Sequence, residues 1–450
     1  MLIRFNVSNF LSFNEMQEFS MIGGKVRSKT EHLYDDNKLK LLKFAAIYGA
    51  NASGKSNLIS AMDFARTMIL GNFPEGSINK YHKTIEENKN LPSYFEFEIK
   101  LDDRYFAYGF EIILNQRNIV DEWLVELLPT GNEREIFTRN VKDKTYSIGE
   151  YFKDKEIINR LELYAQDVKS DGSTLYLTIM NTNKADLYKE NVELSVLKNV
   201  YNWFDLQLDI NYPDNPITNY SYFITKKNIE EISDIISAFG TGISKFNIVE
   251  MSIDTVLQNI PAPILKNVMK ELENHRKPNL KSSLILKRKK EFFIFDVDKD
   301  DEVSVKTIEF QHINTTALFR LSEESDGTAR LLDLIEVLLS DNKNKVYVID
   351  EIDRCLHPQL TYKFVESYLN ISKNSQRQLI VTTHESHLLD FDLLRRDEIW
   401  FVDKDKNGHS SMYSLEAYNE RFDKKIDKAY LEGRYGGVPV FSSIFPVKWE

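Results

Sequence analysis

The chain has 450 residues, and its 58 lysines and arginines against 69 aspartates and glutamates give a formal net charge of −11 at pH 7. With 42% hydrophobic and 12% aromatic residues it can bury a large core, so the composition excludes a wholly disordered chain. The length by itself favours two or three domains.

Targeting, redox and charge features narrow the class of protein further. No run of about 18 apolar residues occurs, so we expect no membrane-spanning helix. The opening MLIRFNVSNFLSF alternates like a strand and not like a signal peptide. The single cysteine, Cys355, excludes an internal disulfide framework and a cysteine-based zinc site. We therefore expect a cytoplasmic protein, whose acidic balance argues against generic coating of nucleic acid or anionic membrane, although a local basic patch could still bind either.

The first 150 residues predict strands, a sharp glycine loop and a helix. The apolar run Leu41–Gly49 is typical of one strand buried on both faces. Asn57–Leu70 then places apolar side chains at helical spacing. From Tyr94 to about Ser147 short alternating runs favour antiparallel strands.

The middle of the chain, 151–279, has mostly helical periodicity, and we interpret it as a helical insertion. Strand alternation returns in Ser282–Val297 and Val303–His312. The last third alternates helices with strands, which indicates a parallel sheet built from βαβ units; the predicted elements are a helix at Gly327–Leu339 and strands at Lys345–Asp350, Gln378–Thr383 and Glu398–Val402.

The glycine loop GANASGKS fits the phosphate-binding pattern G-x-x-x-x-G-K-[ST]. In this pattern backbone N–H groups surround phosphates, the lysine reaches the β- and γ-phosphates, and the final hydroxyl can bind Mg²⁺. A turn that contains glycine and lysine by chance is the alternative, but this motif follows a buried strand and opens an amphipathic helix. The predicted nucleotide-binding residues are Gly49, Ala50, Asn51, Ala52, Ser53, Gly54, Lys55, Ser56 and Asn57.

A second motif, KVYVIDEID, brings two carboxylates to the end of a predicted strand. Asp350 suits a Mg²⁺ contact together with Ser56, and Glu351 suits polarisation of the attacking water. Adjacent acidic residues at a strand end are often plain solvated caps, but a preceding phosphate loop favours the functional interpretation.

Two further segments carry candidate site residues. The run QLIVTTHESHLLD ends a strand at His384, whose imidazole could bond the γ-phosphate or the water. No third metal ligand lies near His384 and His387 in the sequence, so we expect no metal site at this pair and no catalytic role for His387. Ser325 and Gly327 open a helix about twenty residues ahead of Asp350, although a simple N-cap explains Ser325 equally well.

Together these motifs resemble an ATP-binding-cassette (ABC) ATPase head of the SMC and RecF kind. The string DEIDRCLHP, in which a D-loop follows the two acids, carries this resemblance most strongly. It implies that Ser325 and Gly327 are a signature motif acting in trans on a second subunit's nucleotide, that Asp353 lies in the D-loop, and that His384 is the switch histidine. The signature departs from Leu-Ser-Gly-Gly, and Gln116 is only a formal candidate for the Q-loop glutamine.

A narrower resemblance is to the prokaryotic AAA ATPase family numbered fifteen, which covers most of the chain. Its segments are NVSNFLSF, YGANASGKSNLI, ESDGTARLLDL, VIDEIDRCLHP, TTHESHLLD, LRRDEIWFVDKDKNG and YLEGRYGGVPVF. The resemblance implies an α/β fold: an ABC-type P-loop NTPase head with a mixed sheet, a parallel core and an antiparallel β lobe, carrying a helical insertion. We divide the chain into the first half of the head (1–150), the insertion (151–279), the second half of the head (280–420) and a tail (421–450).

The same resemblance implies an ATPase that uses ATP and Mg²⁺ and forms a homodimer or higher oligomer through an ATP sandwich. Members of the family serve anti-phage systems of the RloA/AbiL and PARIS types, so the implied partners are a separate effector (RloB-like or a Toprim nuclease) and a phage-encoded trigger. We expect no nuclease in this chain, because only 66 residues follow His384.

Two other functions are weighed against this one. A transporter's nucleotide-binding subunit is disfavoured by the large helical insertion. A RecF-like DNA-repair or DNA-clamping ATPase, with DNA as its partner, is the stronger alternative; it is supported by a basic cluster of Arg276, Lys277, Lys281, Lys287, Arg288, Lys289 and Lys290.

Overall fold

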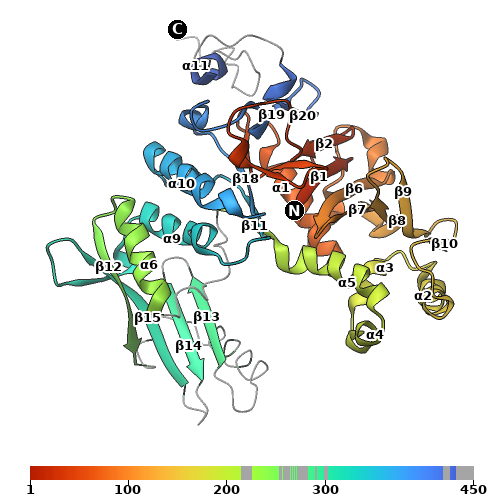
Figure 1. Cartoon of the computed structure of the whole chain (residues 1–450), viewed down its shortest axis with the longest axis horizontal. Helices are drawn as coiled ribbons and strands as arrows, with labels where there is room; N and C mark the ends of the chain where they lie inside the picture. Colours follow the sequence, from red (N-terminus) through yellow and green to blue (C-terminus); the bar gives the residue numbers. More distant parts are fainter. Residues whose placement is uncertain are drawn as a thin grey trace, which may run out of the picture. The chain divides into compact units, whose positions relative to one another are not determined.

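The computed structural model describes residues 1–213, 226–252, 282–288, 291–297, 303–418 and 426–431, with a few single positions between 252 and 281. The chain divides into two compact units (Figure 1). The first comprises Met1–Pro213, Asn342–Asp353 and Val365–Glu450, and the second Asp214–Asp341 and Arg354–Phe364.

A seven-stranded antiparallel sheet forms one layer of the first unit, as the alternating runs predict. In β6, every second residue from Ser93 to Ile99 is buried, because successive side chains of a strand point to opposite faces. The strand order is β10-β9-β8-β7-β6-β1-β2, with bounds β1 Leu2–Ser8, β2 Gln17–Ser20, β6 Ser93–Leu101, β7 Arg104–Ile113, β8 Asn118–Leu127, β9 Glu133–Asn140 and β10 Thr145–Ile148.

The second layer is a six-stranded sheet whose first five strands are parallel, which confirms the predicted parallel core. The strands β5, β17 and β18 are buried along their whole length, in keeping with their continuous apolar sequence. The order is β11-β17-β18-β5-β19-β20, with bounds β11 Leu208–Asn211, β17 Val346–Ile349, β18 Gln378–Thr382, β5 Phe44–Tyr48, β19 Ile399–Lys404 and β20 Ser410–Ser414.

Helix α1 (Lys55–Ile69) lies in the core that the two sheets share. Phe64 of α1 meets Phe10, between β1 and β2, and Phe95 of β6 at ring-centroid distances of 5.4 and 5.1 Å. Ala45 and Ile47 of β5 belong to the same buried cluster. The helix that follows the glycine loop is therefore held on more than one side.

The opposite face of β5 meets two further helices. Phe44 packs against Tyr368 of α10 (Pro358–Ile371), and Tyr48 packs against Tyr430 of α11 (Ile426–Leu431). These contacts leave β5 with no solvated face.

The single strand predicted over Leu41–Gly49 is wrong in one respect, because it divides at Lys43. β4 (Lys40–Leu42) pairs with β3 (Leu33–Asp35), whereas β5 joins the parallel sheet. Between them the Lys43 ammonium donates to the carbonyl oxygens of Glu31 (3.1 Å) and Lys373 (2.7 Å). Burial lowers the pKa of Lys43 to about 8.

The described part of 151–279 contains helices but also two strands, β11 and β12. Its helices in the first unit are α2 Lys155–Val168, α3 Tyr176–Asn181, α4 Ala185–Glu190 and α5 Ser195–Asn202. A buried ion pair between Arg139 and Glu122, at 3.0 Å, anchors the connection between α2 and α3 to the sheet. Arg139 donates to carbonyls between α2 and α3, and Glu122 accepts from the first N–H groups of α3.

The second unit is an antiparallel sheet with helices packed on it. The strand order is β12-β15-β14-β13, with β16 beside β15. Ile232 and Ile236 of α6 share a buried cluster with Leu332 and Ile335 of α9 and with the sheet. The bounds are α6 Lys226–Ala238, α9 Asp326–Leu339, β12 Ile243–Met251, β13 Ser282–Arg288, β14 Glu291–Val297, β15 Val303–His312 and β16 Leu318–Arg320.

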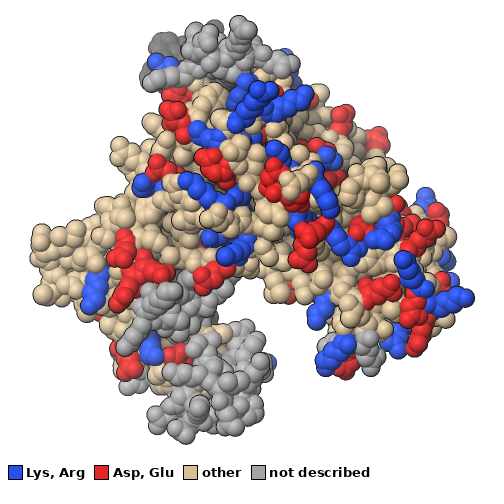
Figure 2. Space-filling view, viewed as in Figure 1, with Lys and Arg blue, Asp and Glu red and all other residues tan. Residues whose placement is uncertain are grey.

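Two expectations about the surface concern a basic cluster and a membrane-spanning helix. The side chains of the basic cluster between Arg276 and Lys290 lie outside them. Over the face shown in Figure 2, positive and negative side chains are intermixed. No helix among the described residues is long and apolar enough to cross a membrane.

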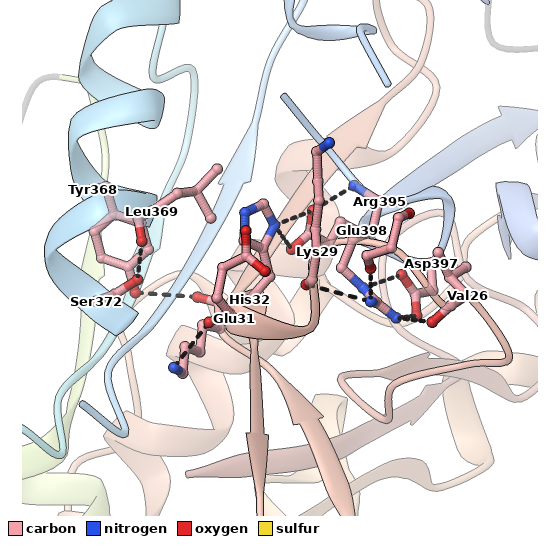
Figure 3. A network of polar contacts seen from close by, with 12 residues as sticks. Val26, Lys29, Glu31, His32, Tyr368, Leu369, Ser372, Arg395, Asp397 and Glu398 are labelled. Carbon is pink, nitrogen blue, oxygen red and sulfur yellow. Dashed lines mark hydrogen bonds and ion pairs between the residues drawn. The ribbon is translucent and has the colours of Figure 1, made fainter. Parts of the chain in front are cut away.

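A buried polar network ties the segment before β3 to the start of β19 (Figure 3). The Arg395 guanidinium is fully buried, pairs with Asp397 at 2.6 Å and donates to the carbonyl oxygens of Val26, Ser28 and Lys29. Beside it, the Nδ1 atom of His32 lies 2.9 Å from Glu398. The network joins the first forty residues to the parallel sheet.

Replacing Asp397 with asparagine should destabilise the protein by about 3 kcal/mol, because it leaves the Arg395 charge buried without a carboxylate. Denaturant unfolding measures this, and the exposed Asp392→Asn serves as the matched control, with an expected change of less than about 0.5 kcal/mol. Equal stability of the two variants would contradict the importance of the ion pair.

Candidate functional site

The glycine loop joins β5 to α1 and is shaped by its two glycines. A Cβ atom on Gly49 would lie 2.4 Å from the Ser53 hydroxyl and 2.5 Å from the Val402 carbonyl oxygen. Gly54 has φ +117°, and a Cβ there would lie 2.6 and 2.8 Å from the hydroxyls of Ser410 and Ser12. Neither position can accept a side chain without moving the loop.

Lys55, the first residue of α1, turns its side chain back over the loop. Its ammonium donates to the carbonyl oxygens of Gly49 (2.8 Å) and Ala50 (3.2 Å). Burial lowers its pKa to about 8, even though the nearby carboxylates of Asp350, Asp353 and Glu351 act in the opposite direction. A partly buried ammonium that is bonded to carbonyls suits an incoming phosphate.

The loop also offers unpaired donors. No side chain among the described residues caps the N-terminus of α1, and an uncapped helix N-terminus can bind an anion through its first N–H groups. Among the described residues, the buried Ser53 hydroxyl has no hydrogen-bond partner. These features fit the phosphates of a nucleotide.

A hydrogen-bonded cluster joins the loop to the ends of β17 and β18. The Oδ1 atom of Asp350 accepts from the Ser56 hydroxyl (3.1 Å) and from the Thr382 hydroxyl (2.5 Å). The backbone N–H of Glu351 donates to the same Thr382 oxygen at 2.8 Å. The predicted pair of Ser56 and Asp350 is therefore brought together by the fold.

These residues fit Mg²⁺ in its usual mode and not a dedicated metal cage. Within the described residues there is no group of three or more His, Cys, Asp or Glu that could hold a metal. Mg²⁺ commonly binds through one or two protein oxygens and completes its shell with water and substrate phosphates. One carboxylate and one hydroxyl meet that requirement.

Glu351, Asp353 and His384 lie at the same edge of the parallel sheet. The backbone N–H of His384 donates to Asp353 at 3.3 Å. Desolvation by the surrounding protein, followed by repulsion from Lys55, holds the pKa of His384 below its ordinary value although the ring has solvent access. This lowered pKa favours the neutral imidazole, which can both donate and accept a hydrogen bond.

Ser325 and Gly327 belong to the second unit. The Ser325 hydroxyl accepts from the Thr328 N–H at 3.0 Å, so it is the N-cap of α9, as the simpler alternative predicts. A Cβ on Gly327 would lie 2.9 Å from the Cys355 carbonyl oxygen. A role in trans for Ser325 and Gly327 stays a prediction.

Three residues of the site were missed by the sequence analysis. Besides Thr382, the Ser12 hydroxyl accepts from the Asn57 amide at 2.6 Å, and the Ser410 hydroxyl donates to the Ser53 carbonyl at 2.5 Å. Ser12 and Thr382 lie in the quoted segments NVSNFLSF and TTHESHLLD, but neither segment indicated the partner of its hydroxyl. Gln116 is exposed in the turn between β7 and β8.

Comparison with protein families identifies the family to which the sequence belongs. Residues 44–390 match the family described as "AAA domain, putative AbiEii toxin, Type IV TA system" (AAA_21). The chain belongs to the AAA_21 family. It is accordingly a mixed α/β P-loop NTPase with a parallel core sheet and antiparallel sheets, and it carries the ATP-binding P-loop domain of an AAA protein. No curated protein matches the sequence significantly.

Among solved structures, this AAA_21 chain is similar to SMC heads. An SMC head bound to the C-terminal winged-helix domain of ScpA has 15% identity and a TM-score of 0.39 over 92% of this chain and 97% of that one. The SMC head of Thermotoga maritima has 14% identity and a TM-score of 0.37 over 92% and 98%. An SMC head with an extended coiled coil, bound to the ScpA C-terminal domain derived from Pyrococcus furiosus, has 15% identity and a TM-score of 0.35 over 95% and 97%.

The pKa of Lys55 leads to a prediction for nucleotide affinity. Phosphates bind the protonated ammonium and raise its pKa, so affinity should be greatest below pH 8 and should weaken as the pH rises through 8, by up to about tenfold per pH unit. Titration with a fluorescent ATP analogue between pH 7 and 9.5 measures this. Lys55→Ala should bind at least about 100-fold more weakly and without this pH dependence. A constant wild-type affinity over the range would contradict the prediction.

Proposed function

We propose that the chain is an ATP-hydrolysing switch that controls a separate effector protein in an anti-phage system. The observation that carries the enzymatic part is the meeting of Lys55, the Ser56–Asp350 pair and Glu351 at the carboxyl ends of β5 and β17, the two parallel neighbours of β18. In open α/β sheets, ligands bind outside this edge.

The proposed mechanism assigns one task to each side chain. Lys55 and the N-terminus of α1 bind the phosphates, while Ser56 and Asp350 would hold Mg²⁺. When bound, Mg²⁺ would neutralise part of the charge that develops on the phosphate oxygens. Glu351 orients the attacking water and accepts its proton, and the neutral His384 hydrogen-bonds to the γ-phosphate or to that water.

The switch requires two states that differ in their contacts with the γ-phosphate. We propose that ATP is bound between two copies of the chain, with Ser325 and Gly327 of one copy completing the site of the other and Asp353 in the D-loop between them. Closing over the γ-phosphate would favour the dimer, and hydrolysis would remove that preference. The exposed Ser325 hydroxyl at the N-terminus of the 14-residue α9 supports this role.

The family description supports the effector part of the proposal. Its description names an abortive-infection toxin and a type IV toxin–antitoxin system. The motifs that resemble the prokaryotic family fifteen favour a system of the RloA/AbiL or PARIS type, with a RloB-like or Toprim-domain effector in a separate chain and a phage-encoded trigger. The segment 151–279, whose β11 borders the catalytic edge, is the proposed docking region for that effector.

The variant Glu351→Gln tests both hydrolysis and dimerisation. It should retain ATP binding, lose about 100-fold or more of kcat, and accumulate as an ATP-bound dimer in mass photometry. Lys55→Ala should stay monomeric with ATP. The exposed Glu133→Gln on the antiparallel sheet is the matched control and should hydrolyse within about twofold of wild type.

Two results would contradict parts of the proposal separately. Wild-type hydrolysis by Glu351→Gln would show that another residue acts on the water. A monomer under every condition, with hydrolysis intact, would exclude the site shared between two copies.

A further inference from the structure

Thr382 lies where the two nucleotide motifs meet. It is the last residue of β18, which runs between β17 and β5 in the parallel sheet. β17 ends at the carboxylates Asp350 and Glu351, and β5 ends at the glycine loop. Thr382 is completely buried, and it lies two residues before His384 in the QLIVTTHESHLLD run, which by itself indicates no role for it.

The single hydroxyl of Thr382 serves two neighbours at once. It donates to the Oδ1 atom of Asp350 at 2.5 Å and accepts from the backbone N–H of Glu351 at 2.8 Å. A hydroxyl has one proton to donate and lone pairs to accept, so both bonds can exist together. The carboxylate of Asp350 and the backbone of Glu351 are thereby linked to one atom.

The backbone of Thr382 adds a third bond to the same turn. Its carbonyl oxygen accepts from the N–H of Ile352 at 3.1 Å. Glu351 lies between these two bonded N–H groups and has φ +48°, in the left-handed region that side chains other than glycine and asparagine rarely adopt. A strained backbone of this kind persists only where its surroundings hold it.

We infer that Thr382 is a positioning residue for hydrolysis: its hydroxyl holds the Glu351 turn and aims the Asp350 carboxylate toward the metal position beside Ser56. The inference rests on the proposed function. Thr382 acts through Asp350 and Glu351 and does not itself touch the phosphates. It also couples β18, which leads to His384, to the strand that carries the acids.

The loss of this hydroxyl has a defined chemical consequence. Valine has nearly the same shape as threonine, so Thr382→Val would leave the Glu351 N–H without its partner and remove one donor from Asp350. Serine would restore the hydroxyl at the cost of one methyl group. Comparing the valine and serine variants therefore separates the effect of the hydrogen bonds from the effect of packing.

The test compares hydrolysis and nucleotide binding in Thr382→Val, Thr382→Ser and wild type. Thr382→Val should lower kcat by about 10- to 100-fold, with ATP affinity in EDTA unchanged and with a smaller gain in affinity on adding Mg²⁺. Thr382→Ser should recover kcat to within about threefold of wild type. Thr361→Val is the matched control, because Thr361 is also fully buried and its hydroxyl has no hydrogen-bond partner among the described residues.

Each outcome decides between the inference and its alternatives. A wild-type kcat and Mg²⁺ response in Thr382→Val would overturn the inference, as would equal losses in the valine and serine variants, which would indicate a packing effect. If the wild type itself hydrolyses no ATP, the proposed function fails, but the Mg²⁺-dependent gain in ATP affinity still tests whether Thr382 orients Asp350. A thermal melt of each variant identifies any loss that comes from unfolding.

Discussion

The structure depends on one constraint, which is that three buried parallel strands end at the same edge. β5, β17 and β18 are neighbours in the sheet, and in-register pairing places Ile349 beside Val381 and Thr382 beside Ile47. The residues that follow each strand must therefore come close together. The glycine loop lies hundreds of residues before the acidic pair, and the acidic pair lies tens of residues before the His384 segment. They nevertheless form one polar cluster, because the sheet brings the ends of these strands together.

Burial gives that cluster its chemical properties. Lys55 is held by carbonyl oxygens in a partly desolvated loop, and this desolvation lowers its pKa to about 8. Repulsion from the same ammonium contributes to the low pKa of His384. The three acids around Lys55 favour its charged form, but desolvation outweighs them. A bound polyanion would add further negative charge beside Lys55 and would therefore raise the pKa of its ammonium.

The position of the loop is maintained by contacts from distant parts of the first unit. Ser12, between β1 and β2, and Ser410, at the start of β20, both reach the loop or the helix that follows it. Aromatic packing holds α1 against the antiparallel layer, and the Arg395 network ties the segment before β3 to the start of β19. The loop and α1 are therefore held by contacts from both layers of this unit.

The sequence by itself determined the motifs, the alternation of the antiparallel strands and the buried character of the parallel ones, because these depend on local spacing and hydrophobic pattern. It also predicted Ser56 and Asp350 as partners, since both follow buried strands of a parallel sheet. It did not reveal that Lys43 divides the apolar run at Leu41–Gly49, or that four residues of the expected helical insertion form β11. Thr382 and Ser410 were equally hidden, because a threonine in an apolar strand and a serine in a short edge strand carry no local sign of their partners. Only the tertiary structure decided these points, since each depends on which strands become neighbours.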